Sequence, residues 1–221
     1  MLEAEGAHHH MSIADPIRDS EEYPPLRVVR DGGVRDLEAA QRAAADFLSA
    51  LGIDLARDGL AETPRRMAHA YAELFTAPPF RLTTFPNDEG YDELVVARGI
   101  PVRSVCEHHL LPFVGVAHVG YLPGARILGL SKLARVVEAF ARGPQVQERL
   151  TQQTAHWLAD HLHAKGVGVV VEAEHLCMTL RGVQATGTTT VTSALLDALR
   201  DDAGTRAEFF SLTWSDGRGT R

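Results

Sequence analysis

Both cysteines of the chain lie in short segments that also contain histidine. Cys106 is followed three positions later by His109, and Cys177 comes two positions after His175. Thiolate sulfur and imidazole nitrogen form a soft ligand set that favours zinc over harder cations. The Cys-x-x-His spacing also allows Cys106 and His109 to reach one ion from a turn. The two segments therefore predict a shared zinc site.

The number of ligands in this predicted site points to catalysis. Three protein ligands leave the fourth tetrahedral position to water, whereas a structural zinc site has four protein ligands. His175 and Cys177 are expected to share one face of a strand, because alternate strand residues point the same way. Spacing alone does not decide which of the adjacent His108 and His109 binds the ion. The other one is then a candidate general acid or base, since imidazole titrates near neutral pH.

Simpler interpretations of the two segments stay open at this point. The cysteines can be buried core thiols next to ordinary polar histidines, or part of a closed structural zinc site with a fourth protein ligand. A disulfide between Cys106 and Cys177 is a further alternative, although nothing in the sequence suggests export to an oxidising compartment.

Basic residues between the two segments suit an anionic ligand. Lys132 and Arg135 are three positions apart at the start of an expected helix, where free N–H groups and the helix dipole favour anions. Ser131 can cap that helix or bind a ligand. Arg181 follows Cys177 by four residues, and a guanidinium pairs bidentately with phosphate. Taken by itself, the segment with Ser131, Lys132 and Arg135 is better explained as a solvated basic surface with a serine cap. For Arg181, the sequence alone does not decide between a surface residue and a ligand contact.

Glu148 adds a group suited to a purine base. It follows Gln147 in another expected helix, and a carboxylate accepts hydrogen bonds from the N–H donors of a guanine edge. By itself, an ion-paired helical glutamate is the simpler interpretation.

The elements that must position these residues follow from hydrophobic periodicity and from proline and glycine signals. Helices are predicted over 36–51, from Thr63 onward, and over 130–140, 145–162 and 205–212. Strands are predicted over 93–97, 100–105, 113–121, 167–178 and 188–192. This order predicts an α+β fold, with an antiparallel sheet that carries helices on one face and is preceded by N-terminal helices.

The chain ends and composition complete the prediction. Residues 1–35 are expected to form a flexible arm, in which 1–10 are an expression-tag remnant or precede an alternative start. The rest divides into a helical part, 36–90, and a catalytic part, 91–221.

A net charge of −7 argues against nucleic-acid binding, and no apolar run is long enough to span a membrane. We therefore expect a cytoplasmic protein.

Several motifs resemble the GTP cyclohydrolase I family. In chain order they are Glu62-Thr63-Pro64-Arg65-Arg66, Cys106-Glu107-His108-His109-Leu110-Leu111-Pro112-Phe113, Gly129-Leu130-Ser131-Lys132-Leu133-Ala134-Arg135, Gln145-Val146-Gln147-Glu148-Arg149-Leu150-Thr151, and His175-Leu176-Cys177-Met178 with Arg181-Gly182-Val183. The match runs from about Leu37 to Leu212, and the motifs together are highly specific.

The resemblance assigns roles to the candidate residues. It implies that Cys106, His109 and Cys177 hold Zn²⁺ and that His108 and His175 act as acid–base residues. The remaining implied roles are catalysis by Ser131, triphosphate and ribose binding by Ser131, Lys132, Arg135 and Arg181, guanine binding by Gln147 and Glu148, and a contact from a neighbouring subunit by Arg66.

The resemblance also implies a fold, an assembly and a reaction. The fold is the tunnelling fold, assembled as a toroidal homodecamer with active sites between subunits. The reaction is hydrolysis of GTP to 7,8-dihydroneopterin triphosphate with release of formate, the first step of pterin and folate biosynthesis. Two positions depart from the family pattern. Val116 stands where many relatives carry a basic residue, and Asp197 stands where glycine is usual.

Two other functions are less consistent with these residues than GTP hydrolysis is. A nitrile reductase of the queuosine pathway, with the same fold, would use a cysteine nucleophile and NADPH, which the paired Cys/His ligands do not favour. A non-catalytic paralogue would bind GTP without turnover, but the intact His108, His109 and His175 argue against it.

Overall fold

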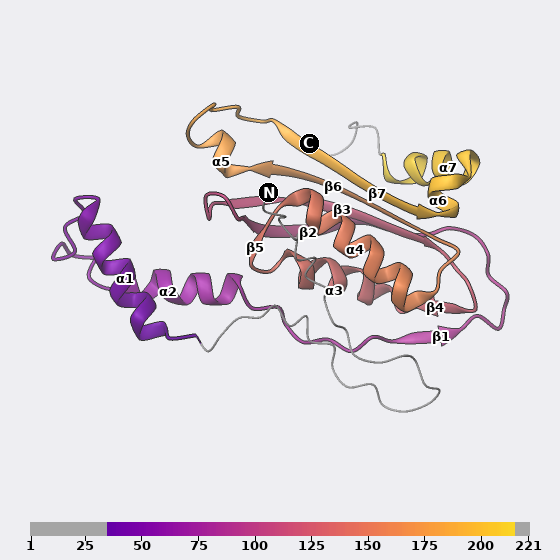
Figure 1. Ribbon diagram of the computed structural model, residues 1–221, viewed down its shortest axis with the longest axis horizontal. Coiled ribbons are helices and arrows are strands. Elements are labelled where there is room, and N and C mark those ends of the chain that lie inside the picture. The colour runs from indigo at the N-terminus through magenta and orange to yellow at the C-terminus, as the bar shows by residue number, and fades with distance from the viewer. Residues whose placement is uncertain (1–34, 215–221) are drawn as a thin grey trace, which may run out of the picture.

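The computed structural model describes residues 35–214, which form a mixed α+β fold (Figure 1). The helices are α1 (Leu37–Ala50), α2 (Thr63–Leu74), α3 (Leu130–Ala141), α4 (Gln147–Leu162), α5 (Leu176–Thr179), α6 (Ala198–Asp201) and α7 (Ala203–Thr213). The strands are β1 (Thr84–Pro86), β2 (Val95–Cys106), β3 (Pro112–Leu122), β4 (Arg126–Leu128), β5 (Pro144–Gln145), β6 (Gly166–His175) and β7 (Thr189–Asp197). The predicted N-terminal arm lies outside the described residues, except for Arg35.

One five-stranded sheet, in the order β5-β2-β3-β6-β7, organises the chain. Its long strands are antiparallel, and only the short β5 runs parallel to its neighbour β2. A second, two-stranded sheet pairs β1 with β4. The predicted mixed α+β class with an antiparallel sheet is therefore confirmed.

Helices α3 and α4 cover one face of the large sheet and enclose the main core. In α3, Leu133, Val136, Val137 and Phe140 are buried at the three- and four-residue spacing of one helix face. They meet alternate residues of the strands, such as Val119 on β3 and Val169 on β6. Period 2 in the strands and period 3.6 in the helices thus bring two apolar surfaces together.

The opposite face of the sheet also carries helices, which corrects the prediction of helices on one face only. Phe209 of α7 and Leu199 of α6 are fully buried there, in a smaller cluster with Val170. Gly120 and Gly168 make room for them, because a Cβ at either glycine would lie within 3 Å of the Phe209 ring. The short C-terminal segment gave no periodic signal for this contact.

Three predicted boundaries differ from the structure. The two strands predicted over 93–105 form the single strand β2, whose register shifts between Ala97 and Ile100. Residue Gln145, predicted as helical, lies in β5 because its backbone pairs with Cys106. Strand β7 continues to Asp197, five residues beyond its predicted end, since it pairs with β6 along that whole length.

The strand predicted over 167–178 is also too long. Strand β6 ends at His175, and the chain then forms the helical turn α5, closed by a hydrogen bond from the Leu180 amide to the Leu176 carbonyl. Cys177 is therefore not on a strand face with His175, and the reason given for their shared direction is wrong. The helical turn itself, with Cys177 buried, directs the thiol inward.

Candidate metal and substrate site

A tight turn between β2 and β3 carries the first Cys/His segment. The Leu110 amide donates to the Cys106 carbonyl at 2.8 Å, and the Cys106 amide donates to the Leu111 carbonyl at 2.9 Å. Leu110 adopts a positive φ of 54°, which lets the chain reverse within a few residues. This reversal returns His109 toward the side chain of Cys106, at the end of β2.

The structure brings Cys106, His109 and Cys177 together, from two segments far apart in the sequence. Their sulfur and nitrogen atoms all lie within 4.8 Å of one another, and the Cys106 Sγ is 3.9 Å from the His109 Nδ1. Ligand atoms around a tetrahedral zinc ion are separated by roughly 3.5 Å, given Zn–S and Zn–N bonds of about 2.3 and 2.0 Å. The donor set therefore fits a zinc ion after a small contraction.

His108 lies beside this group without belonging to it. Its Nδ1 is 3.7 Å from the Cys106 Sγ, but it is not among the three residues whose ligand atoms converge. Its side chain is 65% exposed, and its Nε2 is 4.0 Å from a carboxylate oxygen of Glu107. The geometry thus answers the question that spacing left open: His109 converges with the sulfurs, and His108 faces solvent next to them.

Both cysteines are free and buried. This fits metal binding better than a disulfide between them. Burial and the neighbouring Cys106 thiol raise the pKa of Cys177. A thiolate at this position therefore needs a compensating positive charge, and a bound divalent cation supplies one. This electrostatic need is a second reason, besides the distances, that the site suits a metal.

A hydrogen-bonded network joins the metal-site turn (residues 106–111) to the start of α4. Glu107 forms an ion pair with Arg149, and the Glu107 amide donates to the Gln145 carbonyl at 3.0 Å. The Arg149 Nε donates to the Gln145 side-chain oxygen at 2.6 Å, and Gln145 itself is fully buried. Sequence reasoning missed this network, because Glu107 and Arg149 are 42 residues apart and neither has a local pattern.

The start of α4 places Gln147 and Glu148 close to the turn, and the end of β6 places His175 there. Glu148 is exposed in the first turn of the helix, while Gln147 has only 1% of its surface exposed. The His175 Nε2 lies 2.7 Å from the Gln147 side-chain oxygen, and its ring stacks on Phe113. Burial lowers the pKa of His175, and the nearby Glu148 carboxylate partly opposes this effect. Because Gln147 is buried, its side-chain amide is not exposed to a nucleobase that approaches from solvent.

Helix α3, which carries the predicted anion-binding residues, starts at the other end of the sheet. Leu128, just before α3, donates its amide to the Tyr121 hydroxyl at 2.9 Å, and Tyr121 is near the far end of β3. Tyr121 is nine residues beyond Pro112, so at 3.3 Å per residue the two are separated by roughly 30 Å. In Figure 1, β4 and α5 accordingly lie at opposite ends of the molecule. The start of α3, with Ser131 and Lys132, therefore lies away from the Cys/His group of the same chain, and Arg135 lies one helical turn closer to it.

The two remaining predicted arginines differ in position. Arg181 lies next to the metal group, and its guanidinium donates to the Cys177 carbonyl at 3.3 Å. Arg66 is on α2, where it donates to the Gly59 carbonyl at 3.4 Å. Helix α2 touches the metal-site turn through Tyr71, whose hydroxyl donates to the Leu110 carbonyl at 3.1 Å. Arg66 is on the preceding turns of that helix, farther from the contact.

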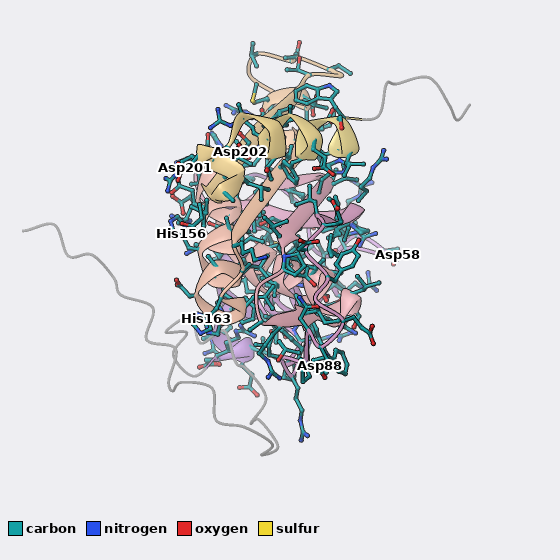
Figure 2. All side chains as sticks on the ribbon, turned by 90° about the vertical axis from the view of Figure 1, so that its right-hand side faces the viewer. Asp58, Asp88, His156, His163, Asp201 and Asp202 are labelled. Carbon is teal, nitrogen blue, oxygen red and sulfur yellow. The ribbon has the colours of Figure 1, made fainter. Side chains whose placement is uncertain are left out.

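Other histidines lie away from the Cys/His group. Figure 2 shows His156 and His163 at the periphery of the molecule, and both are exposed. Within residues 35–214, Cys106, His109 and Cys177 form the one cluster of potential metal ligands. None of the helices in that range has the length and hydropathy needed to cross a bilayer.

Comparison with known proteins gives a consistent result. The family model described as GTP cyclohydrolase I matches residues 40–213. The protein named GTP cyclohydrolase 1 from Corynebacterium glutamicum (strain ATCC 13032) is 50% identical over 182 residues, covering 80% of this chain and 93% of that protein. The one from Mycobacteroides abscessus is 53% identical over 188 residues, covering 82% and 91%. A solved archaeosine synthase QueF-Like in the apo form covers 46% of this chain and 91% of its own at 19% identity, and its TM-score of 0.37 is too low to bear on the fold.

Proposed function

Because the chain belongs to the GTP cyclohydrolase I family, we propose that it hydrolyses GTP to 7,8-dihydroneopterin triphosphate and formate with the help of zinc. The observation that carries the zinc dependence is the convergence of Cys106, His109 and Cys177 at metal-binding distances. This activity is the entry reaction of pterin and folate synthesis, and we place it in the cytoplasm.

The three converging residues would hold the zinc ion. When bound, zinc supplies Lewis acidity that activates water for attack. The exposed imidazole of His108, beside the group, is suited to giving a proton to N7 of the purine as water adds at C8. His175 and Ser131 are the candidates for the proton transfers that follow, when the ribose carbons rearrange.

Substrate binding divides between the two ends of the sheet. Glu148 is exposed next to the metal-site turn, where its carboxylate suits the N–H donors of guanine. Arg181 lies beside Cys177 and suits the phosphate or ribose end. Ser131 and Lys132 lie at the start of α3, toward the other end of the sheet, Arg135 follows one turn later, and Arg66 lies on α2. We therefore assign these four residues to a site on a neighbouring subunit.

This division favours an oligomer with sites between subunits. We propose the homodecamer of tunnelling-fold subunits that the family resemblance implies. In it, a helical part over 36–90 precedes the catalytic part over 91–221. GTP is the proposed small-molecule partner, and we expect no nucleic-acid or membrane partner.

The test is direct. The purified protein is incubated with GTP, with and without a chelator, and formate and the fluorescence of oxidised neopterin are measured. We expect both products, their loss with the chelator and their return when zinc is added. GTP binding without formate would instead identify a non-catalytic paralogue. Cys177→Ser provides the matched variant, and full activity in it would contradict the ligand assignment.

A further inference from the structure

The buried amide of Gln147 has a fixed orientation. Its nitrogen lies 3.0 Å from the Val171 carbonyl oxygen and 2.9 Å from the Thr190 carbonyl oxygen. Carbonyl oxygens only accept hydrogen bonds, so the group that faces them is the NH₂ of Gln147. The side-chain oxygen of Gln147 therefore faces the other way, toward His175.

Two threonines strengthen this orientation. The Thr151 hydroxyl donates its one hydrogen to the Gln147 main-chain carbonyl at 2.8 Å. The Thr192 hydroxyl, 2.7 Å from the Thr151 Oγ1, must therefore be the donor in that pair. The oxygen of Thr192 is left to accept from the Gln147 nitrogen at 3.2 Å. A flipped amide would place its oxygen against three acceptors, which is unfavourable for a buried group.

The fixed amide determines where the hydrogen of His175 lies. An acceptor oxygen 2.7 Å from the His175 Nε2 requires that Nε2 carry the hydrogen. Stacking on Phe113, with ring centroids 4.7 Å apart and planes 11° apart, fixes the plane of the imidazole. The hydrogen bond to Gln147 uses Nε2, so the two contacts together fix the ring plane and the nitrogen that carries the hydrogen.

We propose that Gln147 is a positioning residue that holds His175 in the Nε2–H tautomer. The proposal rests on the proposed function, in which His175 transfers protons. It also changes the role expected for Gln147 from the resemblance. Both hydrogens and the oxygen of its amide already have partners inside the protein, so base recognition is left to the exposed Glu148.

The kinetic test replaces Gln147 with methionine, which has a similar length and does not form these hydrogen bonds. We expect kcat to fall about 10- to 100-fold, as for other residues that orient a functional histidine. The KM for GTP, the preference for GTP over inosine triphosphate and the zinc content should not change. A raised KM or a lost preference for GTP, with kcat retained, would instead show a base contact and overturn the proposal. Gln152→Met, on the exposed side of α4, is the matched control.

A double-mutant cycle separates positioning from a general structural effect. If Gln147 acts through His175, the variant Gln147→Met/His175→Asn should be no slower than His175→Asn alone. Additive losses would show that Gln147 acts independently of the histidine and would reject the proposal.

The tautomer can be measured without turnover and without a variant at Gln147. In the full-length protein labelled with ¹⁵N in the histidine rings, NMR at a pH where the ring is neutral should show His175 protonated on Nε2. The signal is identified by its absence from His175→Asn. A proton on Nδ1 would overturn the proposal even if Gln147→Met fails to fold. Absence of formate from the wild-type protein would reject the proposed function while leaving this result readable.

Discussion

At the scale of residues, two adjacent histidines have different surroundings, and this difference predicts different losses. His109 converges with both sulfurs, so His109→Ala should lose zinc and activity together. His108 is 65% exposed beside the group, so His108→Ala should keep zinc but lose about 10²- to 10⁴-fold in kcat, the usual contribution of a general acid. Metal content and formate release, measured on the same preparations, check both expectations. Loss of zinc from His108→Ala would reverse the assigned roles.

His118 on β3 predicts a pH dependence of stability. It points away from the main core, and its Nδ1 is buried without a hydrogen-bond partner among residues 35–214. Burial, followed by the charge of Arg98, lowers the pKa of His118, and Glu172 opposes this. A lowered pKa in the folded state means that the unfolded chain binds the proton more tightly. His118 should therefore reduce stability as the pH falls below about 6.5, its ordinary pKa.

The measurement compares wild type with His118→Gln by denaturant unfolding between pH 7.5 and 5.5. Because glutamine does not titrate, the variant should lose less free energy of unfolding over this interval than wild type does. Equal losses in the two proteins would show that His118 does not contribute to the pH dependence.

At the scale of elements, the end of β7 contains a strained residue. Asp197 has φ of 50° and ψ of −127°, the conformation of a type II′ turn position that glycine dominates. Its side chain forms no capping hydrogen bond to α6. A non-glycine residue in such a conformation costs on the order of 1–3 kcal/mol. This strain gives a physical reason why glycine is usual at the position where this chain has Asp197.

Asp197→Gly should therefore stabilise the fold. We expect a gain of about 1 kcal/mol, since the relief of strain is partly offset by the greater freedom of glycine in the unfolded chain. The corresponding rise in Tm is about 2–4 °C for a domain of this size, measurable by thermal unfolding. Asp197→Ala removes the carboxylate but keeps the Cβ. An equal gain in that variant would attribute the effect to charge rather than to the backbone.

The elements also show what the sequence could predict. Helices α1 to α4 were predicted closely, because apolar residues at helical spacing and signals such as Thr63-Pro64 are local. The continuation of β7 was missed because it depends on pairing with β6. The helical turn around Cys177 was missed because its four residues are too few to show helical periodicity. The residue types predicted that the two Cys/His segments meet, and Cys106, His109 and Cys177 do lie together. The choice of His109 over His108 came from the family resemblance, because spacing alone left it open.

The partners of the site residues could not be predicted in the same way. The buried position of Gln147 depends on carbonyls of β6 and β7, and the Glu107–Arg149 pair depends on a turn and a helix 42 residues apart. A motif records residue types, whereas burial and hydrogen-bond direction come from the packing of whole elements.

At the scale of the whole molecule, the long sheet separates the two halves of the predicted site. Helix α3 starts beside Tyr121, and the Cys/His group lies at the other end of β3, roughly 30 Å away. In the proposed function, a complete site therefore combines the metal group of one subunit with Lys132 of another. Contacts of this kind, between different surfaces of neighbouring copies, generate a ring when the rotation from one copy to the next closes.

Subunit mixing tests this arrangement. Lys132→Ala and Cys177→Ser should each be inactive, because each removes one half of every site. When equal amounts are unfolded together and refolded, about one quarter of the sites should combine an intact metal group with an intact Lys132, and activity should return to about that level. Refolding each variant alone is the control, and it should restore nothing. If Lys132 served the metal group of its own chain, every site would contain one of the two lesions. The mixture would then remain as inactive as each variant alone. This result would show that each site lies within a single subunit.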